Sequence, residues 1–257
     1  NNKHEVVIID NLSNSELFIL DNIEKITGVR PIFYNQDLLD FIKTNQIFKK
    51  EKIRGVIHFA AFKSVSESVR SPLKYYENNL LCLINILNSM NGNNVSNFVF
   101  SSSCTVYGQP DKLPVSENSP FKKAESPYAK TKQISEQIIK DFSNSHNNIA
   151  SVSLRYFNPV GAHDSALIGE LPKGVPDNLV PYITQTAAGI REGLSVFGKD
   201  YNTHDGTAIR DYIHVEDLAK AHLKAFSFLK DSDDKNIYEF FNVGTGIGYS
   251  VLDVINS

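Results

Sequence analysis

The chain has 257 residues, of which 41% are hydrophobic and 21% charged, a composition typical of a soluble globular protein with one large domain or two unequal ones. Its net charge of −3 gives no reason to expect a nucleic acid or a membrane surface as partner, and the sequence contains neither a bilayer-spanning apolar run nor a signal-peptide pattern. With only two cysteines, a disulfide framework is not expected, and we predict a cytoplasmic protein.

Short apolar segments alternate with helical patterns through roughly the first 155 residues. The expected strands, in chain order, are EVVIID (5–10), RPIFYN (30–35), GVIHFAA (55–61), NFVFSSS (97–103) and IASVSLRYF (149–157). Helical patterns are expected between them at residues 16–27, 38–49, 72–90 and 128–144. This alternation predicts an α/β fold of the doubly wound, Rossmann-like class, in which helices cover both faces of a parallel sheet.

The composition changes after LRYFNPVG, where Gly, Pro, Asp and Asn become frequent and long loops are expected. We therefore predict a dinucleotide-binding domain over residues 1–155 and a smaller substrate-binding region over residues 156–257. The glycines of NVGTGIGYS lack the spacing of a dinucleotide fingerprint. We interpret that segment as a tight turn before a helix that starts near Ser250.

The first expected strand ends at Asp10, and an acidic residue at such a position commonly binds the adenosine ribose of NAD. The alternative is that Asp10 caps a turn. The glycine-rich loop of a dinucleotide-binding domain stands about 20 residues before this acid, and no glycine precedes Gly28. We therefore expect the first strand and the glycine loop of such a domain to be absent from this chain.

The segment SPYAKTKQISEQ (126–137) predicts a helix start in which Tyr128 and Lys132, four residues apart, share one face. A free phenol titrates near pH ~10, so we expect the ammonium, the positive end of the helix and a bound nicotinamide cation to lower the pKa of Tyr128. Such a tyrosine can take a proton from a sugar hydroxyl while hydride leaves the same carbon. The alternative is an ordinary polar helix start, because Tyr-x-x-x-Lys pairs are frequent on helix surfaces.

Three consecutive serines, called here the serine run (Ser101–Ser103), end the strand NFVFSSS. Hydroxyls at the carboxyl end of a parallel strand face the ligand crevice. Ser103 precedes Tyr128 by 25 residues, which is enough chain for a return to that crevice. Its hydroxyl could then donate to the reacting oxygen or relay its proton. The alternative is a polar loop start.

The histidines of the chain show no metal-ligand spacing, and none is placed beside Ser103 in the manner of a nucleophile elbow. We therefore predict no metal site, and we interpret His58, His163 and His214 as structural.

The strand-end serine, the Tyr-x-x-x-Lys pair and the early acid together resemble the extended short-chain dehydrogenase/reductase superfamily. Longer motifs are similar, in order and over essentially the whole chain, to those of the UDP-galactose (UDP-glucose) 4-epimerase family. These motifs are DNLSNS, VIHFAAFKSVSES, YYENN, FSSSCTVYG, SPYAKTK, LRYFNPVGAH, IGE, NLVPYI, VFGKDY, DGTAIRDYIHVEDLAKAH and FNVGTGIGYSV.

The resemblance implies an isomerase of galactose metabolism that uses NAD to invert C4 of UDP-galactose and UDP-glucose through a transient 4-keto sugar, and it implies a homodimer. The catalytic residues that it implies are Tyr128, Lys132 and Ser103. The implied cofactor-binding residues are Asp10, Asn11, Asp37, Leu38, Phe59, Ala60, Lys63, Asn78 and Tyr156, with Lys132 at the nicotinamide ribose. The implied substrate-binding residues are Phe157, Asn158, Asn178, Leu179, Phe197 and Arg210.

Some positions depart from the family pattern or leave alternatives open. Ala61 stands where the family usually has glycine, and Cys104 where it has alanine. Dehydratases of the superfamily carry an Asp-Glu pair where this chain has Cys104 and Thr105, which counts against the alternative of a sibling dehydratase or decarboxylase. For Arg210, a surface ion pair with Asp211 or Asp217 is the alternative to a diphosphate contact.

The family pattern also implies that this chain stops before the remaining nucleotide contacts and the sugar-specificity position. A non-catalytic binding module or an inactive fragment is therefore a further alternative.

Overall fold

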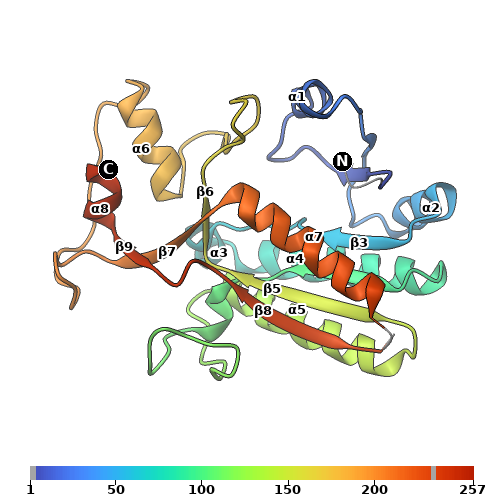
Figure 1. Ribbon diagram of the computed structural model, residues 1–257. Helices are drawn as coiled ribbons and strands as arrows, with labels where there is room; N and C mark the ends of the chain where they lie inside the picture. Colours follow the sequence, from blue (N-terminus) through green and yellow to red (C-terminus); the bar gives the residue numbers. More distant parts are fainter. Residues whose placement is uncertain (1–3, 233–235) are drawn as a thin grey trace. The chain divides into compact units, whose positions relative to one another are not determined.

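The computed structural model describes residues 4–232 and 236–257, and the chain divides into two compact units (Figure 1). Unit 1 comprises Asn1–Asn11, Pro31–Tyr156 and Ala219–Val243, and unit 2 comprises Leu12–Arg30, Phe157–Leu218 and Gly244–Ser257. Each unit is thus assembled from segments that are distant in the sequence. None of the helices in the described ranges combines the length and the apolar character that crossing a membrane requires.

Unit 1 contains a four-stranded parallel sheet in the order β3-β4-β5-β8 and a separate parallel pair, β1-β2. Its strands are β1 (Val7–Asp10), β2 (Ile32–Asn35), β3 (Gly55–His58), β4 (Asn97–Ser101), β5 (Ala150–Tyr156) and β8 (Tyr238–Val243). Its helical elements are α2 (Phe41–Glu51), α3 (Val65–Arg70), α4 (Pro72–Gly92), the 3-10 helix η1 (Cys104–Tyr107), α5 (Pro127–Ser145) and most of α7 (Val215–Asp231). All five strands predicted from the sequence are present.

Buried side chains cover both faces of this sheet. On β4, Phe98 and Phe100 belong to a core cluster with residues of α2, α4 and α5, whereas Val99 belongs to a second cluster with Ala225 and Leu229 of α7. Successive residues of a strand point to opposite faces, so α5 and α7 pack on opposite sides of the sheet (Figure 1). The structure confirms the predicted doubly wound α/β class.

Helix α5 begins where its sequence predicts. The Ser126 hydroxyl accepts a hydrogen bond from the Ala129 amide at 3.1 Å, and Pro127 occupies the first turn. Both features satisfy or avoid backbone donors that a helix start leaves unpaired. The cap therefore fixes which residues of α5 face β4.

Unit 2 contains a three-stranded sheet in the order β6-β7-β9, in which β6 and β7 are parallel and β7 and β9 antiparallel. Its elements are α1 (Phe18–Thr27), β6 (Asn158–Val160), α6 (Leu179–Ala187), β7 (Ile209–His214), β9 (Gly248–Ser250) and α8 (Val251–Asn256). A capping box of Ser250 and Asp253 starts α8, which confirms the predicted helix start near Ser250.

Candidate active site

The serine run (Ser101–Ser103) is buried at the carboxyl end of β4. Ser103 caps η1, and its hydroxyl accepts a hydrogen bond from the Thr105 amide at 3.3 Å. The Ser101 hydroxyl is hydrogen-bonded to the hydroxyl of Tyr156, which ends the neighbouring strand β5. These serines are therefore part of a packed strand end, at the edge of the sheet where ligands bind in folds of this class.

Tyr128 and Lys132 lie on the face of α5 that meets this strand end. The Lys132 Nζ atom is 5.8 Å from the centroid of the Tyr128 ring and donates a hydrogen bond to the Ser101 carbonyl oxygen at 2.6 Å. The Ser103 side chain lies close enough to that of Tyr128 to lower the pKa of the phenol. The structure thus brings together the three residues that the sequence predicts to be catalytic.

The electrostatic setting of Tyr128 differs from the expectation. Burial of the hydroxyl raises the pKa of Tyr128 well above its usual value, and the neighbouring Tyr156 adds to this rise, while the Ser103 side chain opposes it. The side chains around Tyr128 thus raise its pKa overall, because desolvation dominates, whereas the predicted lowering also included the charge of a bound nicotinamide.

Lys132 is itself perturbed. Burial lowers the pKa of Lys132 to about 8, and the Glu136 carboxylate, one turn later on α5, acts in the opposite direction. Burial and the charge of Lys132 also lower the pKa of His58 on β3 to about 3, so this imidazole is neutral at physiological pH. The His58 ring packs against Phe98 and Phe100, with centroids 6.2 and 6.1 Å away, which is consistent with the structural role predicted for it.

Two carboxylates lie where the sequence predicts contacts with the adenosine half of NAD. Asp10 ends β1, and Asp37 follows β2 closely. Asn11 Nδ2 donates to Asp37 Oδ2 at 3.0 Å, which links the two segments. Leu38 is buried in the core, and the Leu39 amide donates to Asp37 Oδ1 at 2.8 Å. The structure therefore brings Asp10, Asn11, Asp37 and Leu38 into one region of unit 1.

The loop after β3 carries Phe59, Ala60 and Lys63, which are all exposed. The Asn79 side chain fixes this loop, because it accepts from the Phe62 amide at 2.8 Å and donates to the Phe62 carbonyl at 3.0 Å. Asn78, also predicted to bind the cofactor, donates from Nδ2 to Asn79 Oδ1 at 3.0 Å. Asn78 is thus linked to the loop through the side chain of Asn79.

Sequence reasoning did not single out His222, a buried residue of α7. Its ring lies 4.6 Å from that of Phe59 and 6.0 Å from that of Tyr156, measured between centroids. His222 therefore contacts two residues of the predicted cofactor set. Its only signal in the sequence is its place as the last residue of DGTAIRDYIHVEDLAKAH.

The predicted substrate residues lie in unit 2, which is described by itself. Asn158 in β6 donates to the Asp211 carbonyl of β7 at 2.9 Å. Asn178 precedes α6 and donates to Glu170 Oε1 at 2.8 Å, and Leu179 is the first residue of that helix. Asn158 is thus the first residue of β6, and Asn178 is the residue that precedes α6. Two further members of the set, Phe157 before β6 and the exposed Phe197, also belong to this unit.

Arg210 is exposed on β7, where its Nη1 atom donates to the Ile209 carbonyl at 2.8 Å. The carboxylate of Asp211 instead accepts hydrogen bonds from the amides of Thr245 and Gly246, at 3.0 and 2.8 Å. Within the described ranges, Arg210 makes no ion pair with Asp211. Asp211, one of the two acids considered as an ion-pair partner of Arg210, therefore binds the turn before β9 instead.

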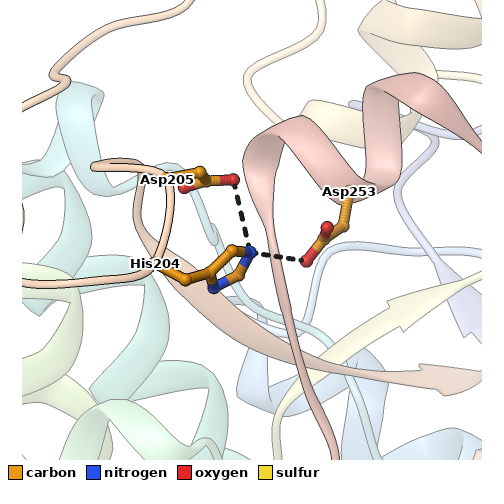
Figure 2. Close-up of side chains that lie close together, drawn as sticks. All are labelled: His204, Asp205 and Asp253. Carbon is orange, nitrogen blue, oxygen red and sulfur yellow. Dashed lines mark ion pairs between the residues drawn. The ribbon is translucent and has the colours of Figure 1, made fainter.

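A second cluster of polar side chains lies elsewhere in unit 2 (Figure 2). His204 Nε2 is 3.6 Å from Asp205 Oδ2 and 3.5 Å from Asp253 Oδ2. However, Asp205 Oδ2 accepts from the Ser250 hydroxyl at 2.5 Å and Asp253 Oδ2 from the Ser250 amide at 2.9 Å. Hydrogen bonds of this kind lower the pKa of Asp205 to about 2. Capping of α8 by Ser250 thus accounts for the positions of the two carboxylates.

A family model described as the NAD dependent epimerase/dehydratase family matches residues 1–244. The chain belongs to this family. A UDP-glucose 4-epimerase from Drosophila melanogaster is 48% identical over 260 residues, which cover 99% of this chain and 74% of that protein. The resemblance to UDP-glucose 4-epimerases that the motifs indicate is thereby confirmed.

Solved structures of family members agree with the fold. A UDP-glucose 4-epimerase from Bifidobacterium longum, in complex with NAD+ and UDP, has a TM-score of 0.95 and 44% identity, and the match covers 100% of this chain and 75% of that one. One from Stenotrophomonas maltophila, with bound NAD and formylated UDP-arabinopyranose, has a TM-score of 0.94 and 46% identity over 99% and 74% of the two chains. The chain thus spans about three quarters of the length of these relatives.

Proposed function

We propose that this member of the epimerase/dehydratase family is an NAD-dependent UDP-glucose 4-epimerase that interconverts UDP-galactose and UDP-glucose. The observation that carries the proposal is the meeting of Tyr128, Lys132 and Ser103 at the carboxyl end of β4. The 48% identity to a UDP-glucose 4-epimerase supports the choice of reaction within the family.

The donor and acceptor set of unit 1 fits NAD. The carboxylates of Asp10 and Asp37 are acceptors suited to ribose hydroxyls. An ammonium has three N–H donors, and one donor of Lys132 is used by the Ser101 carbonyl, so this residue can also bind a ribose. We assign cofactor binding to residues 1–155, through the cofactor-binding residues named from the sequence.

Tyr128 is assigned the role of the base. In the forward half-reaction its phenolate takes the proton of the sugar 4-hydroxyl, and the C4–H bond breaks to leave a 4-keto sugar. NAD, when bound in unit 1, would supply the hydride acceptor and donor for C4, and inversion requires that the hydride return to the opposite face of C4. Tyr128 then returns the proton to the new 4-hydroxyl, so the proton and hydride balances both close. Because burial raises the pKa of Tyr128, the phenolate needs the positive charge of Lys132 and the effect of Ser103, which lowers this pKa.

Within residues 156–257, the part that belongs to unit 2 (Phe157–Leu218 and Gly244–Ser257) is assigned to the nucleotide sugar, and Tyr156 at the boundary is assigned to the cofactor. Arg210 is assigned to the diphosphate, since a guanidinium matches the geometry of phosphate oxygens. Asn178 and Leu179 are assigned to the nucleotide and Phe197 to the uracil. Phe157 and Asn158 complete the set on the side of the sugar and the diphosphate.

The decisive experiment replaces Tyr128 with phenylalanine and follows the conversion of UDP-galactose to UDP-glucose with NAD present. We expect turnover to fall by three or more orders of magnitude while the fold is retained, because the variant lacks the only hydroxyl assigned as base. Tyr249→Phe, which removes an exposed tyrosine hydroxyl from β9, is the matched control and should keep wild-type turnover. Near-native turnover in Tyr128→Phe would contradict the assignment, and a 4-keto-6-deoxy product would favour a dehydratase.

We also propose that the protein is a cytoplasmic homodimer. Helix α4 exposes the apolar side chains of Leu73 and Leu81, two turns apart, on a surface that a second copy could cover. Light scattering should give a mass twice that of the chain. A monomer across the micromolar range would refute the dimer without affecting the assignment of the reaction.

A further inference from the structure

Glu136 is a buried acid that the proposed reaction does not use. It lies on α5 one turn after Lys132, and its side chain is 3% exposed. Its Oε1 atom accepts hydrogen bonds from the Ser102 hydroxyl at 2.5 Å and from Arg155 Nε at 3.0 Å. Its Oε2 atom accepts from Arg155 Nη2 at 2.6 Å and from the Tyr238 hydroxyl at 3.2 Å. The carboxylate is therefore fully enclosed by donors.

Arg155 extends this network through the sheet. Its side chain is 4% exposed, its Nη1 atom donates to the Tyr107 hydroxyl at 3.0 Å, and its guanidinium carbon lies 4.0 Å from the centroid of the Phe240 ring. The Tyr107 hydroxyl in turn donates to Asn242 Oδ1 at 2.6 Å. Because these residues come from β5, β8 and η1, the network joins the neighbouring strands β5 and β8 to the 3-10 helix that follows the serine run.

A buried ion pair of this kind contributes little net stability, because the cost of desolvating two charges offsets their attraction. Its geometry suggests a different role. The Lys132 ammonium is bonded to the Ser101 carbonyl at 2.6 Å, and the Glu136 carboxylate is bonded to the hydroxyl of the next residue, Ser102. Two hydrogen bonds one helical turn apart therefore hold α5 against the last residue of β4 and the residue that follows it. Tyr128 lies one turn before Lys132 on the same helix, and Ser103 follows Ser102 at the same strand end.

We propose that Glu136, oriented by Arg155, is a positioning residue that holds the serine run at the distance from α5 that proton transfer between substrate, Tyr128 and Ser103 requires. The inference rests on the proposed function, because it concerns the same reaction. Glu136 acts through Ser102 and touches neither substrate nor cofactor. Small displacements of reacting groups are costly, since a shift of about 1 Å can reduce a rate on the order of 100-fold.

The test compares Ser102→Ala, Glu136→Gln and the double variant. Each single variant should lower kcat on the order of 10- to 100-fold with little change in the KM for UDP-galactose, because binding groups are untouched. If both residues act through one hydrogen bond, the double variant should lose no more kcat than the worse single variant. Ser102→Ala keeps the Glu136–Arg155 ion pair, so it remains informative if Glu136→Gln folds poorly.

Ser143→Ala is the matched control. The Ser143 hydroxyl on α5 is hydrogen-bonded to the hydroxyl of Ser151 on β5 at 2.8 Å, and both residues are buried. This bond also joins α5 to the sheet, but it lies about two helical turns beyond Glu136. We expect Ser143→Ala to reduce thermal stability to the same extent as Ser102→Ala and to leave kcat unchanged. An equal loss of kcat in the control would show that loosening α5 anywhere has this effect, and would overturn the inference.

A pH profile separates positioning from a general loss of structure. The titratable groups that face Lys132 are Tyr128 and Glu136 on α5 and His58 on β3, with Tyr156 next to Ser101 on β5. The charge of Glu136 favours the ammonium, so Glu136→Gln should move the alkaline limb of kcat to lower pH, whereas Ser102→Ala should not. Wild-type protein without epimerase activity would refute the proposed function. Active wild-type protein with unchanged kcat in both single variants would refute only the positioning role.

Discussion

Replacing Lys132 with methionine should stabilise the folded protein at pH 7 although it should abolish turnover. Lys132 is 5% exposed, and burial lowers its pKa from 10.5 to about 8. A lowered pKa means that the folded protein holds the ammonium less favourably than the unfolded chain does. Methionine has nearly the same length and carries no charge, so it removes this unfavourable contribution without leaving a large cavity.

The magnitude follows from two opposing contributions. One pKa unit corresponds to about 1.4 kcal/mol, so a fall from 10.5 to about 8 corresponds to roughly 3 kcal/mol against the charged folded form. The variant also loses the hydrogen bond to the Ser101 carbonyl, and an unpaired buried acceptor costs about 1–3 kcal/mol. The net expectation is a variant more stable than wild type by about 1 kcal/mol at pH 7.

The difference in unfolding free energy between the wild type and the Lys132→Met variant should depend on pH. The folded protein releases the Lys132 proton near pH 8, whereas the unfolded chain keeps it up to about pH 10.5, so the stability of the wild type rises with pH across that window relative to the variant. Urea unfolding of both proteins at pH 7, 8, 9 and 10, at equal NAD content, measures the difference. The advantage of the variant should shrink above pH 8 and disappear or reverse by about pH 10. A less stable variant at pH 7, or a difference that does not change with pH, would refute the reasoning.

Two further changes test the buried ion pair and the capping of α8. Arg155→Met leaves the Glu136 carboxylate buried without its cation, so urea unfolding should show that the free energy of unfolding falls by about 3–5 kcal/mol. Adding Glu136→Leu should restore most of this free energy, and no recovery in the double variant would contradict this account. Ser250→Ala removes the hydroxyl that accepts from the Asp253 amide at 3.0 Å and should cost about 1–2 kcal/mol, with Ser257→Ala as a control of small effect. Amide hydrogen exchange should show α8 opening more readily in Ser250→Ala, and unchanged protection there would count against the capping role.

The sheet of unit 1 was predictable because its strands carry near-continuous apolar residues and its helices carry local start signals. The start of α5 is an example, since Ser126 and Pro127 specify it within one turn. The fold unit to which α1 belongs could not be predicted. Its periodicity indicates a helix, but a contact such as that of Asn22 Nδ2 with the Leu167 carbonyl, 145 residues away, places it in unit 2.

The candidate site was predictable as a set of residues but not in its electrostatics. Spacing on a helix is sufficient to place Tyr128 and Lys132 on one face. The sign of a pKa shift depends instead on how many neighbours exclude water, and for Tyr128 these neighbours include Tyr156 on another strand. Glu136 was missed for the same reason. In the sequence it resembles a polar residue on an exposed helix face, and it is buried because Ser102, Arg155 and Tyr238 enclose its carboxylate.

The serine run illustrates why three small polar residues can end a buried strand. The carbonyl of its first residue accepts a hydrogen bond from Lys132, the hydroxyl of its second donates one to Glu136, and the side chain of its third lowers the pKa of Tyr128. These partners are spaced four residues apart along α5, which places them on one face, whereas consecutive strand residues point alternately to the two faces of the sheet. One helix face can therefore reach all three serines only because one bond is made to the backbone and because the strand has ended by the third. Substituting any one serine should thus disturb the position of the other two relative to α5.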